Sequence, residues 1–329
     1  LFCLVECRKS FHRNGRQSRN GREDEKRSGW QMRSFLLLAV VGLAAQLVDG
    51  SLGMAYGVTS QSLLLAIGIA PALASAAVHI AEVGTTAASG ASHWRFGNID
   101  WDKVRPLAIP GAIGAFLGAV VISRFITAEA AQPLVAIFLF SLGVYILARF
   151  SFRRHQTPVN VRPISARFLS PLGFVAGFLD AMGGGGWGPI STPTLLSSGR
   201  MEPRKIIGTV DTSEFLVALA ASIGFLISLS FADIPWQVVG ALLLGGVIAA
   251  PVAAYIVRVL PARILGTAVG GVILVTNMRT FLEAVGISGV LAILVYILIV
   301  AVWIAALVFS IRVNSQEKAK PAGGERQPS

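Results

Sequence analysis

Long apolar stretches without a charged residue run through most of the chain. Residues 106–123, 130–148, 236–257 and 287–311 contain no Asp, Glu, Lys, Arg or His. A helix that spans a bilayer needs roughly 17–25 predominantly apolar residues, so each stretch is long enough to cross. The pattern therefore predicts an all-α polytopic membrane protein with about 9 hydrophobic segments.

Two further apolar runs stop short of that length. Residues 35–48 would form a helix of roughly 21 Å, shorter than the ~30 Å hydrocarbon core, and residues 168–179 end in a similar way. The first run ends at Asp49-Gly50, and Asp180 and a run of glycines follow the second. Irregular backbone at membrane depth is tolerated only where it packs against protein or lines a cavity. We therefore expect two broken helical hairpins, which would raise the total to about 11 helices.

The chain contains two related halves. Phe-Gly-Asn-Ile-Asp-Trp at 96–101 recurs as Phe-Ala-Asp-Ile-Pro-Trp at 231–236. Asp49 matches Asp180 at a spacing of 131 residues, and Glu82 matches Glu214 at 132. Self-similarity at a fixed spacing indicates a repeat.

This similarity divides the chain into segments. Each half is predicted to hold one broken Gly-rich hairpin and three transmembrane helices, in residues 33–149 and 168–283. Residues 287–311 are an extra C-terminal helix without a counterpart. Three polar segments complete the chain. Residues 1–32 are a basic N-terminal extension, expected to be disordered or non-native, with Met32 as the expected start of the native protein. Residues 150–167 are a basic cytoplasmic linker, and residues 312–329 are a disordered tail.

Composition and charge agree with a membrane location. The chain is 54% hydrophobic and only 14% charged, with a mean hydropathy of +0.68, whereas soluble domains carry about 25% charged residues. The net charge of +11 lies in residues 1–31, 149–167 and 312–329, which carry +4, +5 and +2. Positive charge in loops and tails is typical of cytoplasmic segments. Because no basic domain with interleaved aromatic residues is present, we expect no nucleic-acid partner.

The positive charges also predict how the halves are oriented. Residues 96–101 are flanked by Arg95, Lys103 and Arg105, whereas the counterpart at 231–236 lies in a stretch, 207–257, with no Lys or Arg. Equivalent loops then fall on opposite sides of the membrane, as in an inverted-topology repeat. This orientation places residues 95–105, 149–167, 200–205, 258–263 and 312–329 in the cytoplasm.

The two breaks are the predicted substrate site. A helix restarts after each break, near Gly57 and near Gly188-Pro189, and helix N-termini attract anions. Two alternatives remain: the glycines could serve close helix packing, and each aspartate could cap the restarting helix. The candidate substrate-binding residues are Asp49, Gly50, Ser51, Gly53, Gly57, Thr59, Ser60, Gln61, Asp180, Gly183, Gly184, Gly185, Gly186, Ser191, Thr192 and Thr194.

Four titratable residues form a second candidate set. His79 and Glu82 lie three residues apart, and Asp211 and Glu214 repeat that spacing in the other half. Such groups in a dry interior suit proton coupling. A metal site or a hydrogen-bonded pair that holds two helices together are the alternatives. Since no catalytic motif and no nucleotide-binding loop occurs, we predict neither an enzyme nor a bound cofactor.

Both break sequences resemble a known family. Leu-Val-Asp-Gly-Ser-Leu-Gly-Met-Ala-Tyr-Gly-Val-Thr-Ser at 47–60 and Ala-Gly-Phe-Leu-Asp-Ala-Met-Gly-Gly-Gly-Gly-Trp-Gly-Pro at 176–189 are similar to the paired signatures of the sulfite exporter TauE/SafE family, over about 33–311. The resemblance implies a multi-pass permease of the bacterial inner membrane that exports sulfite or organosulfonates. It carries over Asp49, Gly50, Gly53, Gly57, Asp180 and Gly183 to Gly186.

The expected function is therefore proton-coupled export of a small anion, with the lipid bilayer, the anion and protons as partners. The residues themselves do not distinguish sulfite from a sulfonate or another oxyanion. Two rival functions remain: a metal-cation transporter that uses His79, Glu82, Asp211 and Glu214, and a membrane scaffold without transport activity. The oligomeric state is left open.

Overall fold

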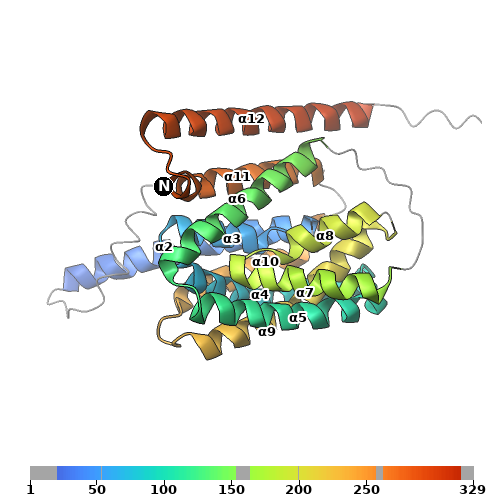
Figure 1. The fold of residues 1–329 in the computed structure, drawn as a ribbon, viewed down its shortest axis with the longest axis horizontal. Coiled ribbons are helices and arrows are strands. Elements are labelled where there is room, and N and C mark those ends of the chain that lie inside the picture. The colour runs from blue at the N-terminus through green and yellow to red at the C-terminus, as the bar shows by residue number, and fades with distance from the viewer. Residues whose placement is uncertain (1–20, 53, 153–163, 199, 257–261, 320–329) are drawn as a thin grey trace, which may run out of the picture.

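The computed structural model describes residues 21–52, 54–152, 164–198, 200–256 and 262–319, and it is all-helical there. Eleven helices and no strand occur in these ranges, which confirms the predicted fold class. In chain order the helices are α2 (Gly21–Leu52), α3 (Tyr56–Ala66), α4 (Pro71–Arg95), α5 (Trp101–Arg124), α6 (Ala128–Phe152), α7 (Ala166–Gly183), α8 (Trp187–Ser198), α9 (Pro203–Ser228), α10 (Trp236–Ile256), α11 (Ala262–Ala284) and α12 (Gly289–Ala319) (Figure 1).

The helix order is the same in both halves. A long helix (α2 or α7) is followed by a short one (α3 or α8) and then by three long helices, and α12 comes after the second set. The packing is reciprocal as well: α5 lies against α7 and α10 against α2, while α4 packs on α9 and α6 on α11. Exchanging the halves reproduces these contacts.

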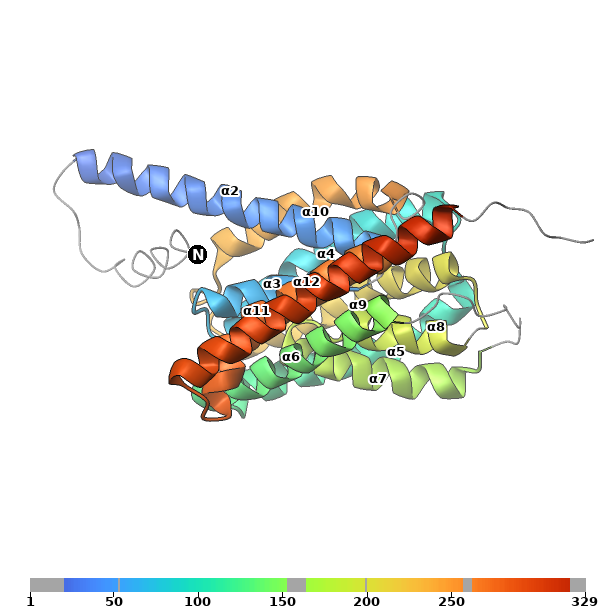
Figure 2. The same cartoon turned by 90° about the horizontal axis from the view of Figure 1, so that it is seen from above.

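Corresponding helices run in opposite directions along the molecule. In Figures 1 and 2, α2 runs from left to right and α7 from right to left. The carboxyl ends of α4, α6, α8, α10 and α12 all lie at the right-hand end, which is the end that the sequence assigns to the cytoplasm.

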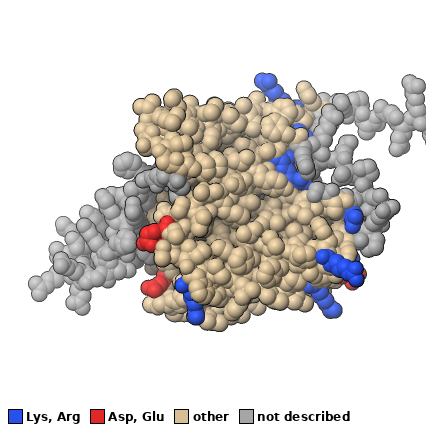
Figure 3. All heavy atoms as spheres, in the orientation of Figure 1, with Lys and Arg blue, Asp and Glu red and all other residues tan. Residues whose placement is uncertain are grey.

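Positive charge collects at the same end. Most of the Lys and Arg atoms visible in Figure 3 lie at its right-hand side, and acidic atoms lie mainly at the left. Arg95, Arg105, Arg167, Arg200 and Arg204 are exposed and sit near the ends of α4, α5, α7, α8 and α9. This asymmetry is the one expected of a membrane protein with this end in the cytoplasm.

In the part of the chain that the structure describes, six helices are long and apolar enough to cross a membrane, namely the apolar parts of α2, α5, α6, α9, α10 and α12. The helix α12 is the least covered by protein, with 6% of its apolar window buried, so it presents its side chains to lipid. The helix α4 is not in this set because it buries many polar side chains inside the bundle, among them Ser75, His79, Glu82 and His93. The polar interior therefore lies along α4 and its counterpart α9.

Two helices are longer than the sequence predicted. The helix α2 begins at Gly21, inside the segment expected to be a disordered extension, and α12 continues to Ala319, beyond the expected end at 311. Both additions are rich in Glu, Lys, Arg and Gln, which have high helix propensity. Residues 1–20, 153–163 and 320–329 lie outside the described residues, and with them most of the predicted extension, linker and tail.

Candidate functional site

Both predicted breaks are present at equivalent positions. The first separates Leu52 at the end of α2 from Tyr56 at the start of α3, and the second separates Gly183 at the end of α7 from Trp187 at the start of α8. Tyr56 and Trp187 are 131 residues apart, the same spacing as Asp49 and Asp180. Gly53 lies outside the described residues, as does the side chain of Ser51.

The second break lies directly against the start of α3. A Cβ atom added to Gly57 would lie 2.9 Å from Gly185 Cα and 3.0 Å from Gly184 O. A Cβ atom on Gly185 would collide with the backbone of Val58, and Gly184 has a φ of +71°. Glycine is required here for close approach and for a left-handed backbone. At this point the two backbones leave no room for a ligand.

Two other glycines of the predicted set serve helix packing. A Cβ atom on Gly50 would lie 2.6 Å from the Cβ atom of Ala253 on α10, and one on Gly183 would collide with the ring of Phe138 on α6. For these two positions the packing interpretation holds.

Each aspartate caps the helix that restarts after it. Asp180 Oδ1 accepts hydrogen bonds from the backbone N–H groups of Gly186 (2.6 Å) and Trp187 (2.9 Å). Asp49 Oδ1 accepts one from the N–H of Tyr56 at 3.3 Å. These N–H groups would otherwise lack a partner inside the helix. The capping role predicted as an alternative is therefore present in both halves.

Asp180 also forms an ion pair with the other half. His79 Nε2 on α4 lies 3.1 Å from Asp180 Oδ2, and both side chains are buried. His79 Nδ1 lies 2.8 Å from the carbonyl oxygen of Ser75, which can only accept. With an acceptor at each ring nitrogen, the geometry suits a doubly protonated imidazolium facing an ionised carboxylate.

We call this contact between the halves, at His79 and Asp180, a crossing. The equivalent crossing, which joins α2 and α9, is acidic. Asp211 on α9 takes the position of His79, and it faces Asp49, the equivalent of Asp180. One carboxylate oxygen from each of Asp49, Asp211 and Glu214 lies within 4.8 Å of the others. All three residues are buried, with exposed fractions of 2%, 1% and 7%.

A residue that the sequence analysis missed belongs to this acidic crossing. His93 on α4 is fully buried, and its Nε2 atom lies 3.8 Å from Asp211 Oδ2. Its Nδ1 atom lies 3.3 Å from Asn98 Nδ2. A signal for it exists in the sequence, since His79, Glu82, Thr86, Ser89 and His93 recur every three or four residues and so share one helix face.

Glu82 is the remaining acidic group of the predicted set. Both of its carboxylate oxygens are buried and lack a hydrogen-bond partner among the residues that the structure describes. Its Oε1 atom would lie 3.1 Å from a Cβ atom on Gly57, so the carboxylate is directed at the start of α3. The structure thus brings all four predicted titratable residues to the two crossings, His79 and Glu82 at one and Asp211 and Glu214 at the other.

The predicted hydroxyl and amide groups differ in how they are engaged. Ser60 and Ser191, again 131 residues apart, are fully buried within the first two turns of α3 and α8, and neither hydroxyl has a protein partner within the described part of the chain. Gln61 Nε2 donates to Pro71 O (3.2 Å), and Thr194 Oγ1 donates to Ile190 O (2.6 Å). Thr59 is half-buried and Thr192 is buried.

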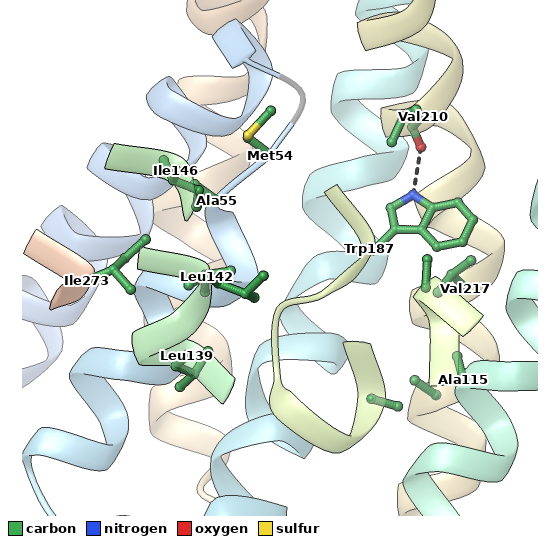
Figure 4. Close-up of a cluster of buried hydrophobic side chains, with 14 of the residues drawn as sticks. Met54, Ala55, Ala115, Leu139, Leu142, Ile146, Trp187, Val210, Val217 and Ile273 are labelled. Atoms are coloured by element: carbon green, nitrogen blue, oxygen red, sulfur yellow. Dashed lines mark hydrogen bonds between the residues drawn. The ribbon is translucent and has the colours of Figure 1, made fainter. Parts of the chain in front are cut away.

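Apolar side chains enclose this polar centre. Figure 4 shows Met54 and Ala55 beside the first break and Trp187 at the second, where its indole N–H donates to Val210 O at 3.0 Å. Trp187, Met54 and Ala55 belong to the main hydrophobic core. The centre is therefore shielded from water by side chains that belong to the breaks themselves.

A cleft of about 400 Å³ opens at the basic end of the molecule, between the α4–α5 loop and the start of α9. Its lining includes the basic Arg200 and Lys205 and also the acidic Asp100, Asp102 and Glu202. Lys205 also donates to Ile99 O at 3.0 Å and so ties the loop to α9.

Comparison with known proteins identifies relatives over most of the chain. The family model described as "Sulfite exporter TauE/SafE" matches residues 38–280. The "Probable membrane transporter protein YtnM" of Bacillus subtilis (strain 168) is 50% identical over 279 residues, which cover 84% of this chain and 93% of that protein. No solved structure matches. A family match over most of the length, together with a relative of this similarity, shows that the chain belongs to the sulfite exporter TauE/SafE family.

Proposed function

We propose that this membrane transporter moves a small anion, sulfite or an organosulfonate, across the bacterial inner membrane, and that the movement is coupled to protons. The single observation that carries the proposal is the matched pair of buried hydroxyls, Ser60 and Ser191. Buried polar groups without a protein partner are rare and call for water or a ligand. Two of them at equivalent positions, each within the first two turns of a restarting helix, suit the oxygens of an oxyanion.

The acidic centre explains why protons would be needed. An anion that enters this region approaches Glu82, whose carboxylate has no compensating partner among the described residues. Like charges in a dry interior repel strongly, so the anion binds best when Glu82 is protonated. Proton uptake and anion binding are then linked.

Transport also requires the two breaks to separate. Because the backbones at Gly57 and Gly185 are in contact, the structure represents a closed state at that point. Rocking of one half against the other would open a path between α3 and α8, as in other inverted-repeat transporters. Outward movement is the direction that the family description, a sulfite exporter, implies.

Efflux from proteoliposomes tests this function. Vesicles loaded with labelled sulfite, or with a small labelled sulfonate, are followed with and without a pH gradient, for the wild type and for Ser60→Ala and Ser191→Ala. We expect efflux from the wild type and a loss of at least about tenfold in each variant, because a buried hydrogen bond to a charged group contributes roughly 1.5–3 kcal/mol.

Ser141→Ala is the matched control, since Ser141 lies on α6 and its hydroxyl donates within the helix to Ile137 O. Its efflux should equal that of the wild type. Unchanged efflux in both site variants would reject Ser60 and Ser191 as anion ligands. Absence of flux of either anion from well-folded wild-type protein would reject the anion substrate.

A further inference from the structure

We propose that Asp49, Asp211, Glu214 and His93 form a binding site for a divalent metal cation at the acidic crossing. The site is distinct from the hydroxyls assigned to the anion, and binding of the cation can be measured without any transport.

The carboxylate geometry fits one ion. Three oxygens, one from each carboxylate, lie within 4.8 Å of one another. Some point must then lie no farther than about 2.8 Å (4.8 Å divided by √3) from all three, which is close to the 2.0–2.6 Å of metal–oxygen bonds. A small inward rotation of the side chains would complete the coordination.

His93 is the independent observation that points to a ligand. Its Nε2 atom is buried and has no hydrogen-bond partner within the described residues, yet it is directed at Asp211 from 3.8 Å. That separation is too long for a hydrogen bond. It is about 0.4 Å longer than the ~3.4 Å between two ligands that hold one ion in tetrahedral geometry at about 2.1 Å each. Because His93 lies outside the set of ligand atoms that are all within 4.8 Å of one another, its ring must move toward the carboxylates to join the coordination.

Asn98 sets the orientation of the ring. As oriented in the structure, the Asn98 amide nitrogen donates to His93 Nδ1 at 3.3 Å, which places the ring proton on Nε2. When a metal binds at Nε2, the Asn98 amide turns over so that its Oδ1 accepts from Nδ1–H. A partner on the second ring nitrogen is the usual support of a metal-binding histidine. Mixed imidazole and carboxylate ligands favour transition metals such as Mn²⁺ and Zn²⁺ over Na⁺.

The matched crossing shows why only this one needs a cation. There, His79 supplies the positive charge next to Asp180 at 3.1 Å. At the acidic crossing, Asp211 stands where His79 would be, and three buried carboxylates have no Lys or Arg partner among the described residues. Buried charges are paired or coordinate metals, so a divalent cation would provide what His79 provides in the other half.

Mn²⁺ binding to the purified full-length chain in detergent tests the site. After EDTA treatment, the unfolding midpoint is followed by tryptophan fluorescence with and without Mn²⁺, and bound Mn²⁺ is counted by electron paramagnetic resonance. We expect one bound ion and a rise of about 5 °C when Mn²⁺ is well above its dissociation constant. Nitrogen modulation in the pulsed spectrum should report His93 and should vanish in His93→Gln.

Glu214→Gln and Glu82→Gln form a matched pair, because the two glutamates occupy equivalent positions and both are buried. Mn²⁺ stabilisation should disappear in Glu214→Gln and persist in Glu82→Gln. The proposal is overturned if Mn²⁺ and Zn²⁺ fail to bind the wild type at millimolar concentration, if both variants lose binding equally, or if Na⁺ alone stabilises. Since the nitrogen signal is read on the wild type, a variant that does not fold leaves the test valid.

Discussion

The two crossings between the halves use equivalent positions but hold opposite chemistry. At one, His79 and Asp180 pair at 3.1 Å, and the ring of Phe225 lies 5.8 Å from the imidazole. At the other, Asp211 replaces His79, and His93 occupies the position that matches Phe225. Each crossing thus contains one histidine, but the histidine occupies a different position in each.

This difference in residues changes what each crossing can do. The His79–Asp180 pair is complete within the protein, so it suits a permanent link between α4 and α7. The acidic crossing joins α2 and α9, and within the described residues no basic side chain lies in hydrogen-bond contact with it. With the cation site proposed above, the duplicated backbone would provide one fixed link and one that responds to ions.

The largest effect on stability is expected when the ion pair between His79 and Asp180 is removed. His79→Gln leaves the buried charge of Asp180 uncompensated and should lower the free energy of unfolding by about 3–5 kcal/mol. Asp211→Asn at the matched position removes one of several neighbouring negative charges, so in metal-free buffer it should be neutral or stabilising. Tryptophan-monitored unfolding of both variants measures the difference. Equal destabilisation would mean that the two crossings are alike.

Much of this comparison could be predicted from the sequence. The spacings of 131 and 132 residues identified both breaks, and the absence of Lys and Arg between 207 and 257 predicted that the halves oppose each other. Those features depend on local sequence and on membrane electrostatics. The pairing across the halves could not be predicted, because His79 and Asp180 are 101 residues apart and meet only through helix packing.

The role of His93 was likewise only partly predictable from the sequence. Its position on the polar face of α4 is readable from the spacing of His79, Glu82, Thr86 and Ser89. Its nearness to Asp211 depends on how α4 packs against α9, which one sequence does not define. The predicted metal alternative named His79, which pairs with Asp180 in the structure, and did not include His93.

The next largest effect on stability is expected from a substitution at the contact between the two breaks. Gly185→Ala places a methyl group 2.6 Å from the carbonyl carbon of Gly57 and should destabilise the closed state by about 1–3 kcal/mol. Gly286→Ala is the control, because Gly286 also has a positive φ, +75°, but no atom within 4 Å of its Cβ position. Its cost should stay near 1 kcal/mol. Chemical denaturation compares them, and equal losses would mean that the contact between the breaks adds nothing.

The pH dependence of transport tests the role of Glu82. If anion binding needs a neutral Glu82, efflux should rise as the loading side is acidified. Glu82→Gln is permanently neutral, so the rate should become insensitive to pH near neutrality while transport persists. The measurement is the initial efflux rate from proteoliposomes between about pH 5.5 and pH 8, a range in which buried carboxyl groups can titrate. An unchanged pH profile would reject Glu82 as the coupling residue.

The smallest effect is expected for the second histidine. Among the described residues, His93 makes one side-chain hydrogen bond, the 3.3 Å contact with Asn98, and lies 3.8 Å from Asp211. His93→Gln in metal-free buffer should therefore lower the free energy of unfolding by only about 1 kcal/mol. The same substitution at His79 is expected to cost several times more, although both rings are fully buried. If His93→Gln proved as destabilising as His79→Gln, His93 would already pair with Asp211 as an imidazolium. The acidic crossing would then carry its own positive charge and would have no need of a metal ion.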